Sequence, residues 1–377
     1  MRYRLKEDQR SYVKNLYAKV EEKLSAECDR MEDIIPYIPA NGLYTDMGAQ
    51  SINWWTNGFW AGILWQLYHA TQQIKYKRTA IKIEHRLDDA FSNFDQLDHD
   101  VGFLWLHTSV ANHRMTGDME ARRKGLLAAS VLVSRFNLKG GFLRAWNPPA
   151  ACSMIIDCLM NLPILYWASE QTKDPRYSMI AGQHIDSALK YLIRPDGSCN
   201  HIAEMDALTG EFIDNPGGQG YEKGSSWSRG QAWAIYGMAL AYGYNNKEEY
   251  LDAAKKVAHY FIANAAMTDY VSLIDFRSPA EPVYYDTTAT ACAACGLLEL
   301  ANHVKEYEKD LYIQSAFRML EGMEHSFLDL NISRDGILLH GSARYHRESD
   351  REVPIIYGDY FLLELLLRFQ DKDFLIW

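Results

Sequence analysis

The sequence predicts an all-α protein, a closed barrel of six helical hairpins that forms a single domain over residues 1–377. Apolar residues recur at helical spacing in twelve segments along the chain. Strand-like alternation is limited to short pieces such as residues 270–276. Because no Pro/Ser-rich linker, charge run or residue-level repeat divides the chain, a closed barrel is favoured over a solenoid.

The twelve helical segments make six hairpins. The clearest one follows Asp174 and Pro175, a cap and a first-turn proline, and ends before the turn at residues 195–197. The predicted helices lie near 8–27, 57–73, 78–95, 103–116, 121–136, 157–171, 176–193, 229–245, 248–265, 287–305, 310–328 and 357–369.

The composition is that of a globular protein with a large core. Hydrophobic residues fill 48% of the 377 positions, and the net charge of -10 argues against a nucleic-acid partner. The chain begins without an apolar leader, and no run approaches the roughly 18 apolar residues that a membrane span needs. We therefore expect a cytoplasmic monomer or homodimer with a small-molecule substrate, without a membrane or nucleic-acid partner.

Six scattered cysteines are expected to be reduced thiols, because they do not form the dense framework of a small disulfide-bonded domain. Cys292 and Cys295 form a C-x-x-C in a run of small residues, without a second pair or a nearby histidine. Close helix packing is therefore favoured over a zinc site.

Residues rich in polar and aromatic chemistry fall where hairpins join or helices begin. These stretches are 53–60, 97–103, 152–163, 199–233 and 340–358. In a closed helical barrel, the loops at one end form the site. The sequence therefore predicts one site built from these loops.

A D-H-D tripeptide, Asp98 to Asp100, lies between two predicted helices. Its carboxylates and imidazole are compatible with a metal, with the positioning of a substrate, or with a solvated loop and helix cap. Because the tripeptide has no supporting ligand set, we expect no metal.

Asp157 is a single carboxylate in an almost wholly apolar run, residues 153–163. Burial disfavours the charged form, so we expect the pKa of Asp157 to rise and the group to act as an acid. The alternative is a helix cap or a hydrogen-bonded core carboxylate. Pro163 predicts that the helix starts late or kinks there.

The stretch G-S-S-W-S-R-G-Q-A-W, residues 224–233, combines two indoles with a guanidinium. Tryptophan faces stack on sugar rings, and Arg229 offers a planar fork of donors suited to a carboxylate, so an acidic sugar is the simplest ligand. The alternative is that Trp227 and Trp233 are core aromatics. A second aromatic cluster, residues 53–60, suits a platform for a ring.

Three of these pieces together resemble the unsaturated glucuronyl hydrolases, glycoside hydrolase family 88. They are D-V-G-F at 100–103, I-I-D-C-L-M-N-L-P at 155–163 and W-S-R-G-Q-A-W at 227–233. The resemblance spans nearly the whole chain, from W-T-N-G-F-W-A-G-I-L-W at 55–65 to Y-G-D-Y at 357–360.

The resemblance implies an (α/α)6 barrel and a reaction without metal or cofactor. Its substrate would be the 4,5-unsaturated glucuronic acid that lyases leave at the non-reducing end of chondroitin, hyaluronan or heparin-type fragments. Asp157 would be proton donor and base, and Asp100 the second essential carboxylate. The residues implied to surround the sugar are His99, Trp55, His201, Gln219, Trp227, Arg229, Trp233 and Tyr345.

The sequence departs from the family pattern in two places. Some relatives have D-H-H-D where this chain has the shorter D-H-D, which leaves the role of Asp98 open. The S-x-x-S-x-K arrangement shared by relatives that prefer sulfated disaccharides is absent from residues 347–352.

Three other functions remain open at this stage. An unsaturated rhamnogalacturonyl hydrolase would use the same barrel and chemistry on pectin fragments, although R-G-Q-A-W argues against it. An N-acyl-sugar epimerase would need paired histidines, for which His99, His201 and His346 are available. A non-catalytic carbohydrate-binding protein would explain the tryptophans but not Asp157.

Overall fold

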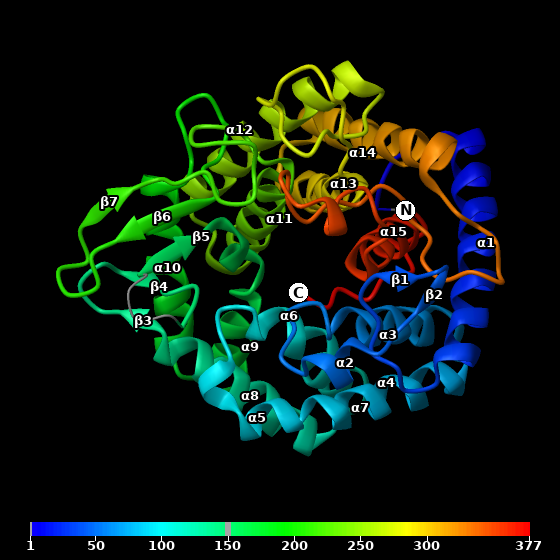
Figure 1. Ribbon diagram of the computed structural model, residues 1–377, viewed down its shortest axis with the longest axis horizontal. Helices are drawn as coiled ribbons and strands as arrows, with labels where there is room; N and C mark the ends of the chain where they lie inside the picture. The colour runs from blue at the N-terminus through cyan, green and yellow to red at the C-terminus, as the bar shows by residue number, and fades with distance from the viewer. Residues whose placement is uncertain (1, 148–151) are drawn as a thin grey trace.

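The computed structural model describes residues 2–147 and 152–377, and its main helices form two concentric rings (Figure 1). The inner ring contains α3 (Phe59–Thr71), α6 (Val101–Trp105), α9 (Pro163–Thr172), α11 (Ser228–Asn245), α13 (Thr287–His303) and α15 (Ile356–Phe369). The outer ring contains α1 (Glu7–Met31), α4 (Ile74–Leu87), α8 (Met119–Ser134), α10 (Arg176–Tyr191), α12 (Glu248–Ala265) and α14 (Glu306–Phe327). This arrangement confirms the predicted all-α barrel.

Five of the helix pairs are consecutive hairpins: α3 with α4, α6 with α8, α9 with α10, α11 with α12, and α13 with α14. The sixth pair joins the two ends of the chain, because α1 packs on α15. The barrel is therefore closed by its first and last helices. No helix in the described ranges is both long enough and apolar enough to cross a membrane.

The inner helices are buried on nearly every side, whereas the outer helices expose one face. Small residues allow the inner helices to approach closely. A Cβ added at Gly296 of α13 would meet Tyr236 of α11 at 3.0 Å. Cys292 and Cys295 lie in this tightly packed helix as buried free thiols, in agreement with the packing interpretation of the C-x-x-C.

Two predicted helices are interrupted near the site. The segment predicted over 103–116 is α6, a π-helical turn η2 (Leu106–Val110) and α7 (Ala111–Thr116). The segment predicted over 157–171 begins as a 3-10 turn, η3 (Ile156–Met160), and α9 starts late at Pro163. The short helices are α2 (Met47–Gln50), α5 (Asp89–Ser92), η1 (Phe94–Gln96), η4 (Ala266–Thr268) and η5 (Glu348–Asp350).

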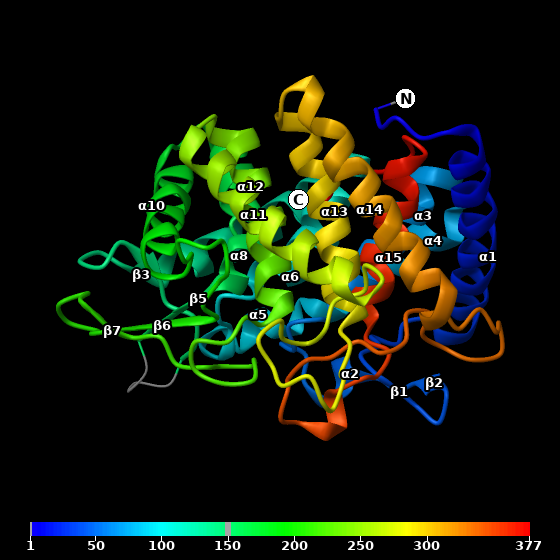
Figure 2. The same cartoon turned by 90° about the horizontal axis from the view of Figure 1, so that it is seen from above.

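The small sheets and the long loops lie at one end of the barrel (Figure 2). They are the hairpins β1 (Pro39–Ala40) with β2 (Leu43–Tyr44) and β3 (Phe136–Asn137) with β4 (Phe142–Leu143), and the antiparallel sheet of β5 (Ser153–Ile155), β6 (Ile202–Met205) and β7 (Phe212–Asp214). The strand-like piece at 270–276 forms only isolated bridges, Leu273 with Tyr285 and Asp275 with Trp227. The apolar–polar alternation of residues 270–276 therefore belongs to a loop with isolated bridges to neighbouring loops at the mouth of the barrel, and not to a strand of a sheet.

Candidate active site

A cavity of about 370 Å³ opens among these loops. Two carboxyl-bearing segments face it, residues 98–100 and Asp157, together with Arg229. Its lining is Ser51, Asn53, Trp54, Trp55, Asp98, His99, Asp100, Trp146, Ile155, Asp157, Gln219, Arg229 and Arg344. A larger hollow of about 750 Å³, beside α14, shares no residue with this cavity and holds none of the predicted site residues.

Asp157 and His201 are brought together by the pairing of β5 with β6. Ile155 pairs with Ile202, and the backbone N–H of Ile156 donates to the carbonyl of His201 at 3.0 Å. As a result, Nε2 of His201 lies 3.3 Å from Oδ2 of Asp157. Nδ1 of His201 accepts a hydrogen bond from the backbone N–H of Gln219 at 3.0 Å.

The pKa of Asp157 differs from the sequence-based expectation. Burial raises it, but the imidazole of His201 and the positive charge of Arg229 outweigh burial, so the pKa lies below its ordinary value. The expected rise was wrong because the apolar run 153–163 does not reveal the two basic partners that the fold supplies.

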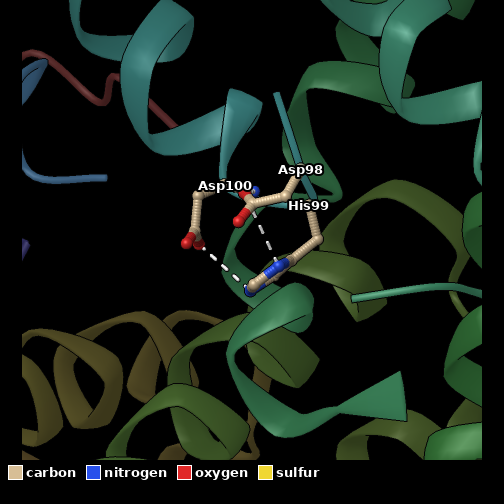
Figure 3. Close-up of side chains that lie close together, drawn as sticks. All are labelled: Asp98, His99 and Asp100. Carbon is tan, nitrogen blue, oxygen red and sulfur yellow. Dashed lines mark hydrogen bonds and ion pairs between the residues drawn. The ribbon is translucent and has the colours of Figure 1, made fainter. Parts of the chain in front are cut away.

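Asp100 is the carboxyl group whose pKa rises. Burial, with the negative charges of Asp98 and Asp157, raises it to about 7 despite the opposing effect of His99. Figure 3 shows the imidazole of His99 held between the two carboxylates of this loop, with Nε2 at 3.2 Å from Oδ1 of Asp100. Nδ1 of His99 lies 2.9 Å from the carbonyl of Ala145.

Asn161 connects the two carboxyl-bearing segments. Its amide nitrogen donates to Oδ1 of Asp100 at 3.3 Å and to the backbone carbonyl of Asp157 at 3.4 Å. Its amide oxygen accepts from the backbone N–H of Phe103 at 2.7 Å. The fully buried Asn161 therefore fixes the loop of Asp100 against η3.

Arg229 is only 2% exposed and lies at the start of α11. Its Nη1 donates to the hydroxyl of Tyr357 at 2.6 Å, and its Nη2 donates to Oε1 of Gln219 and to the carbonyl of Ala343. The guanidinium stacks over Trp227, 4.5 Å from the ring centroid. Burial lowers the pKa of Arg229, but Tyr357, Asp286 and Asp157 raise it by more than burial lowers it. The pKa therefore lies above its ordinary value, and the group stays cationic.

The donor fork of Arg229 is thus largely occupied by the protein, which corrects the expectation that the whole fork faces a substrate carboxylate. Nε is the donor that has no partner in the described chain. The side-chain oxygen of Gln219 is bound to Arg229, so the amide nitrogen of Gln219 is the group left to face the cavity.

Of the remaining predicted site residues, one lines the cavity and the others contact residues around it. Trp55 lines the cavity. Trp227 packs on His201 with ring centroids 4.5 Å apart, and Trp233 is fully buried against Phe103. Tyr345 does not line the cavity, and its backbone N–H donates to the carbonyl of Gln219 at 3.0 Å. Trp233 therefore offers no exposed face to a sugar.

Several residues at or beside the cavity were not predicted as site residues. Trp146 packs edge-on against His99, and Arg344 adds a second guanidinium to the lining. Asn161 was visible as the only amide in the run 153–163. Gly218 precedes Gln219 with φ +66°, and the paired glycines at 217–218 were its sequence signal.

The loop from Asp98 to Asp100 has ligand atoms within 4.8 Å of one another. Nδ1 of His99 is hydrogen-bonded to the carbonyl of Ala145, so Nε2 is the imidazole atom left to act as a ligand.

Two concentric rings of helices surround a cavity lined by the carboxyl groups of Asp98, Asp100 and Asp157, the imidazole of His99, the buried guanidinium of Arg229 and three tryptophans. These features define a carbohydrate-active enzyme whose site suits acid–base chemistry. The family model of Glycosyl Hydrolase Family 88 matches residues 29–272. The chain belongs to this family and is a glycoside hydrolase.

Curated relatives match most of the chain. An unsaturated glucuronyl hydrolase of Bacillus sp. strain GL1 is 36% identical over 84% of this chain and 86% of its own length. An unsaturated chondroitin disaccharide hydrolase of Streptococcus pneumoniae is 36% identical over 86% of this chain and 83% of its own.

Solved structures agree with the family. The unsaturated glucuronyl hydrolase of Streptococcus agalactiae superposes with a TM-score of 0.89 at 32% identity, covering 98% of this chain and 94% of that one. The Bacillus sp. GL1 enzyme gives a TM-score of 0.86 at 34% identity, covering 93% and 95%.

Proposed function

We propose that this enzyme releases 4,5-unsaturated glucuronic acid from the non-reducing end of glycosaminoglycan disaccharides and oligosaccharides made by lyases, and that Asp157 carries out the chemistry. The names of the relatives support the substrate class. We propose that the enzyme acts as a monomer or a homodimer.

The reaction needs one carboxyl group that first gives and then takes a proton. The C4=C5 bond of the substrate is a vinyl ether, so protonation at C4 by Asp157 leaves an oxocarbenium ion at C5. Water adds to C5 and gives its proton to the Asp157 carboxylate. The hemiketal then opens and expels the aglycone. Such acid–base catalysis contributes about 10²–10⁴-fold.

The substrate carboxylate would be received by Nε of Arg229 and the amide nitrogen of Gln219. The two residues are in contact, because Oε1 of Gln219 accepts from Nη2 of Arg229, and both residues line the cavity. The indole of Trp55 provides the apolar face for the ring. Asp100 would hold or tune the reacting groups and need not attack the sugar.

The single observation that carries this proposal is the contact of Asp157 with His201 at 3.3 Å inside a cavity that also holds a buried cation. The same contact argues against an epimerase with paired histidines as free acid and base. Both His201 and His99 have Nδ1 bound to the main chain and Nε2 facing a carboxylate.

Two measurements test the proposal. Incubation with an unsaturated chondroitin or hyaluronan disaccharide should abolish the ultraviolet absorbance of the C4=C5 bond, and a pectin-derived disaccharide is the comparison. Methanol added to the assay should be trapped at C5 as a methyl ketal with the glycosidic bond intact. A methyl group found only at C1 by nuclear magnetic resonance would show direct displacement, with Asp100 and Asp157 then acting as an ordinary glycosidase pair.

A further inference from the structure

The two active-site histidines are held in opposite protonation patterns by the main chain. Nδ1 of His201 accepts a hydrogen bond from the N–H of Gln219, so Nδ1 carries no proton. In the neutral ring the proton is then on Nε2, the atom that faces Asp157 at 3.3 Å. Nε2 is therefore the His201 nitrogen that presents a proton on the side of Asp157.

The turn before Gln219 keeps His201 in this state. Gly218 has φ +66°, and a Cβ at this position would lie 2.0 Å from Nδ1 of His201. A second proton on His201 would point at the N–H of Gln219. Protonation of His201 would thus break the contact that orients the ring, and Gly218 and Gln219 act as positioning residues for it.

His99 has the reverse arrangement. Its Nδ1 lies 2.9 Å from the carbonyl of Ala145, which only accepts, so Nδ1 carries the proton. In the neutral ring Nε2 is then a bare acceptor that faces the carboxyl oxygen of Asp100 at 3.2 Å. A bare imidazole nitrogen and a carboxylate oxygen at this distance repel each other, so a proton on either His99 or Asp100 stabilises the pair.

We propose that the resting enzyme keeps its transferable proton on the His99–Asp100 pair, while Asp157 waits as a carboxylate that accepts from His201. This inference rests on the proposed function, because it assigns the source of the proton that Asp157 delivers to C4. It also gives Asp100 and His99 a joint role as a proton store.

The charges around the pair favour retention of the proton. Asp98 on the same loop and Asp157 on η3 are negative and stabilise it. Arg135, at the end of α8, interacts electrostatically with Asp98 and Asp100 and opposes it. Arg229 and Arg344 are cations that line the same cavity. Cys158 and His184 also lie near the pair, and burial keeps the thiol and the imidazole neutral.

The proton balance closes over one turnover. The bond that holds the proton on Asp100 or His99 breaks as water in the cavity that Asp100 and Asp157 both line relays the proton to Asp157. Asp157 then passes it to C4 as the π electrons form the C4–H bond. Water adds to C5 and returns one proton to Asp157, which restores the pair. Beyond the water that hydrolysis consumes, no co-reactant is needed.

Amide isosteres of histidine test the proposal through the pH dependence of kcat/KM. In the wild type, kcat/KM should fall as the pH rises through about 7, where the pair loses its proton. His99→Gln places an amide donor near Asp100 in place of the Nε2 acceptor, which stabilises the carboxylate. The fall of kcat/KM with rising pH, the basic limb of the profile, should therefore move to lower pH by about one unit. His99→Asn keeps a donor for Ala145 and serves if the first variant does not fold.

Two further variants locate the effect. His201→Gln keeps an amide donor on the side of Asp157. Its kcat should fall, but the basic limb of its kcat/KM profile should stay at the wild-type pH. His184→Gln changes another fully buried histidine, whose Nδ1 accepts from the N–H of Leu143 outside the cavity, and should leave the limb in place. A limb unmoved in both His99 variants, or moved by His201→Gln instead, would overturn the proposal.

Labelling the histidines with ¹⁵N tests the resting state without relying on turnover. Each wild-type signal is assigned by its loss in one variant. The signal that His201→Gln removes should be that of a neutral ring protonated on Nε2. The signal that His99→Gln removes should be that of a ring protonated on Nδ1. The reverse assignment would overturn the inference. Methanol trapping at C5 by the wild type tests the proposed function separately, so failure of the hydration mechanism is distinguishable from failure of the proton store.

Discussion

Nε2 of His201 and Oδ2 of Asp157 lie 3.3 Å apart because two short strands pair in register next to them. The strand β5 ends two residues before Asp157, and β6 begins immediately after His201. The sheet therefore brings two residues that are distant in the sequence into contact at one site.

Asp157→Asn should reduce kcat by at least about 10²-fold, because the amide keeps the shape of the carboxyl group but has no transferable proton. Circular dichroism should show an unchanged fold, and equilibrium binding of the disaccharide should be nearly unchanged. Activity within tenfold of the wild type would remove Asp157 from its role.

Arg229→Lys should raise KM by about tenfold or more, because a point charge replaces neither Nε nor the stack on Trp227. The matched control is Tyr357→Phe, which removes one hydrogen bond of Arg229 and leaves its charge in place. Equal effects of the two variants on KM would mean that Arg229 is structural.

Exhaustive chelation should leave kcat and KM unchanged, because the residues from Asp98 to Asp100 provide a single loop of ligands with one imidazole atom committed elsewhere. Activity is measured before and after dialysis against a chelator. A loss that one divalent metal restores would establish a metal site in this loop.

Gly102→Ala should destabilise the fold by about 1–3 kcal/mol, because the added Cβ would lie 2.6 Å from Cα of Asn161. The change also displaces the amide that binds Asp100. Gly182→Ala, whose Cβ would meet nothing closer than 3.8 Å in helix α10, should instead stabilise by about 0.5–1 kcal/mol. Urea unfolding of both variants checks the pair, and a destabilising Gly182→Ala would contradict the packing argument.

Asp359 should make part of the stability depend on pH. Burial raises its pKa to about 6, although the N–H groups of Leu338 and Ile337 lower it. Because the folded-state pKa is above the unfolded value, its contribution is fully present below about pH 4 and is lost as the pH rises through about 6. Melting temperatures of the wild type and Asp359→Asn between pH 4 and 7 measure this, and the variant should lack that part of the slope.

Helical periodicity alone was enough to predict the barrel. Each of the twelve predicted segments corresponds to a helix or an interrupted helix, because an apolar stripe must be buried against a neighbour. The interruption of the helix after Phe103 was not predictable, since a π turn leaves no mark in the spacing of apolar residues. Nor was the closing pair of α1 and α15, which depends on contacts between the two ends of the chain.

The sequence by itself indicated which side chains gather at the mouth of the barrel. Asp100, Asp157 and Arg229 were named from local motifs and Gln219 from the family resemblance, and all four line the cavity. Only the tertiary structure decided how they differ. The pKa of a carboxyl group depends on the charges and hydrogen bonds around it, and those partners come from other segments. Hence Asp100 has the raised pKa, Asp157 has the lowered one, and Trp233 lies in the core.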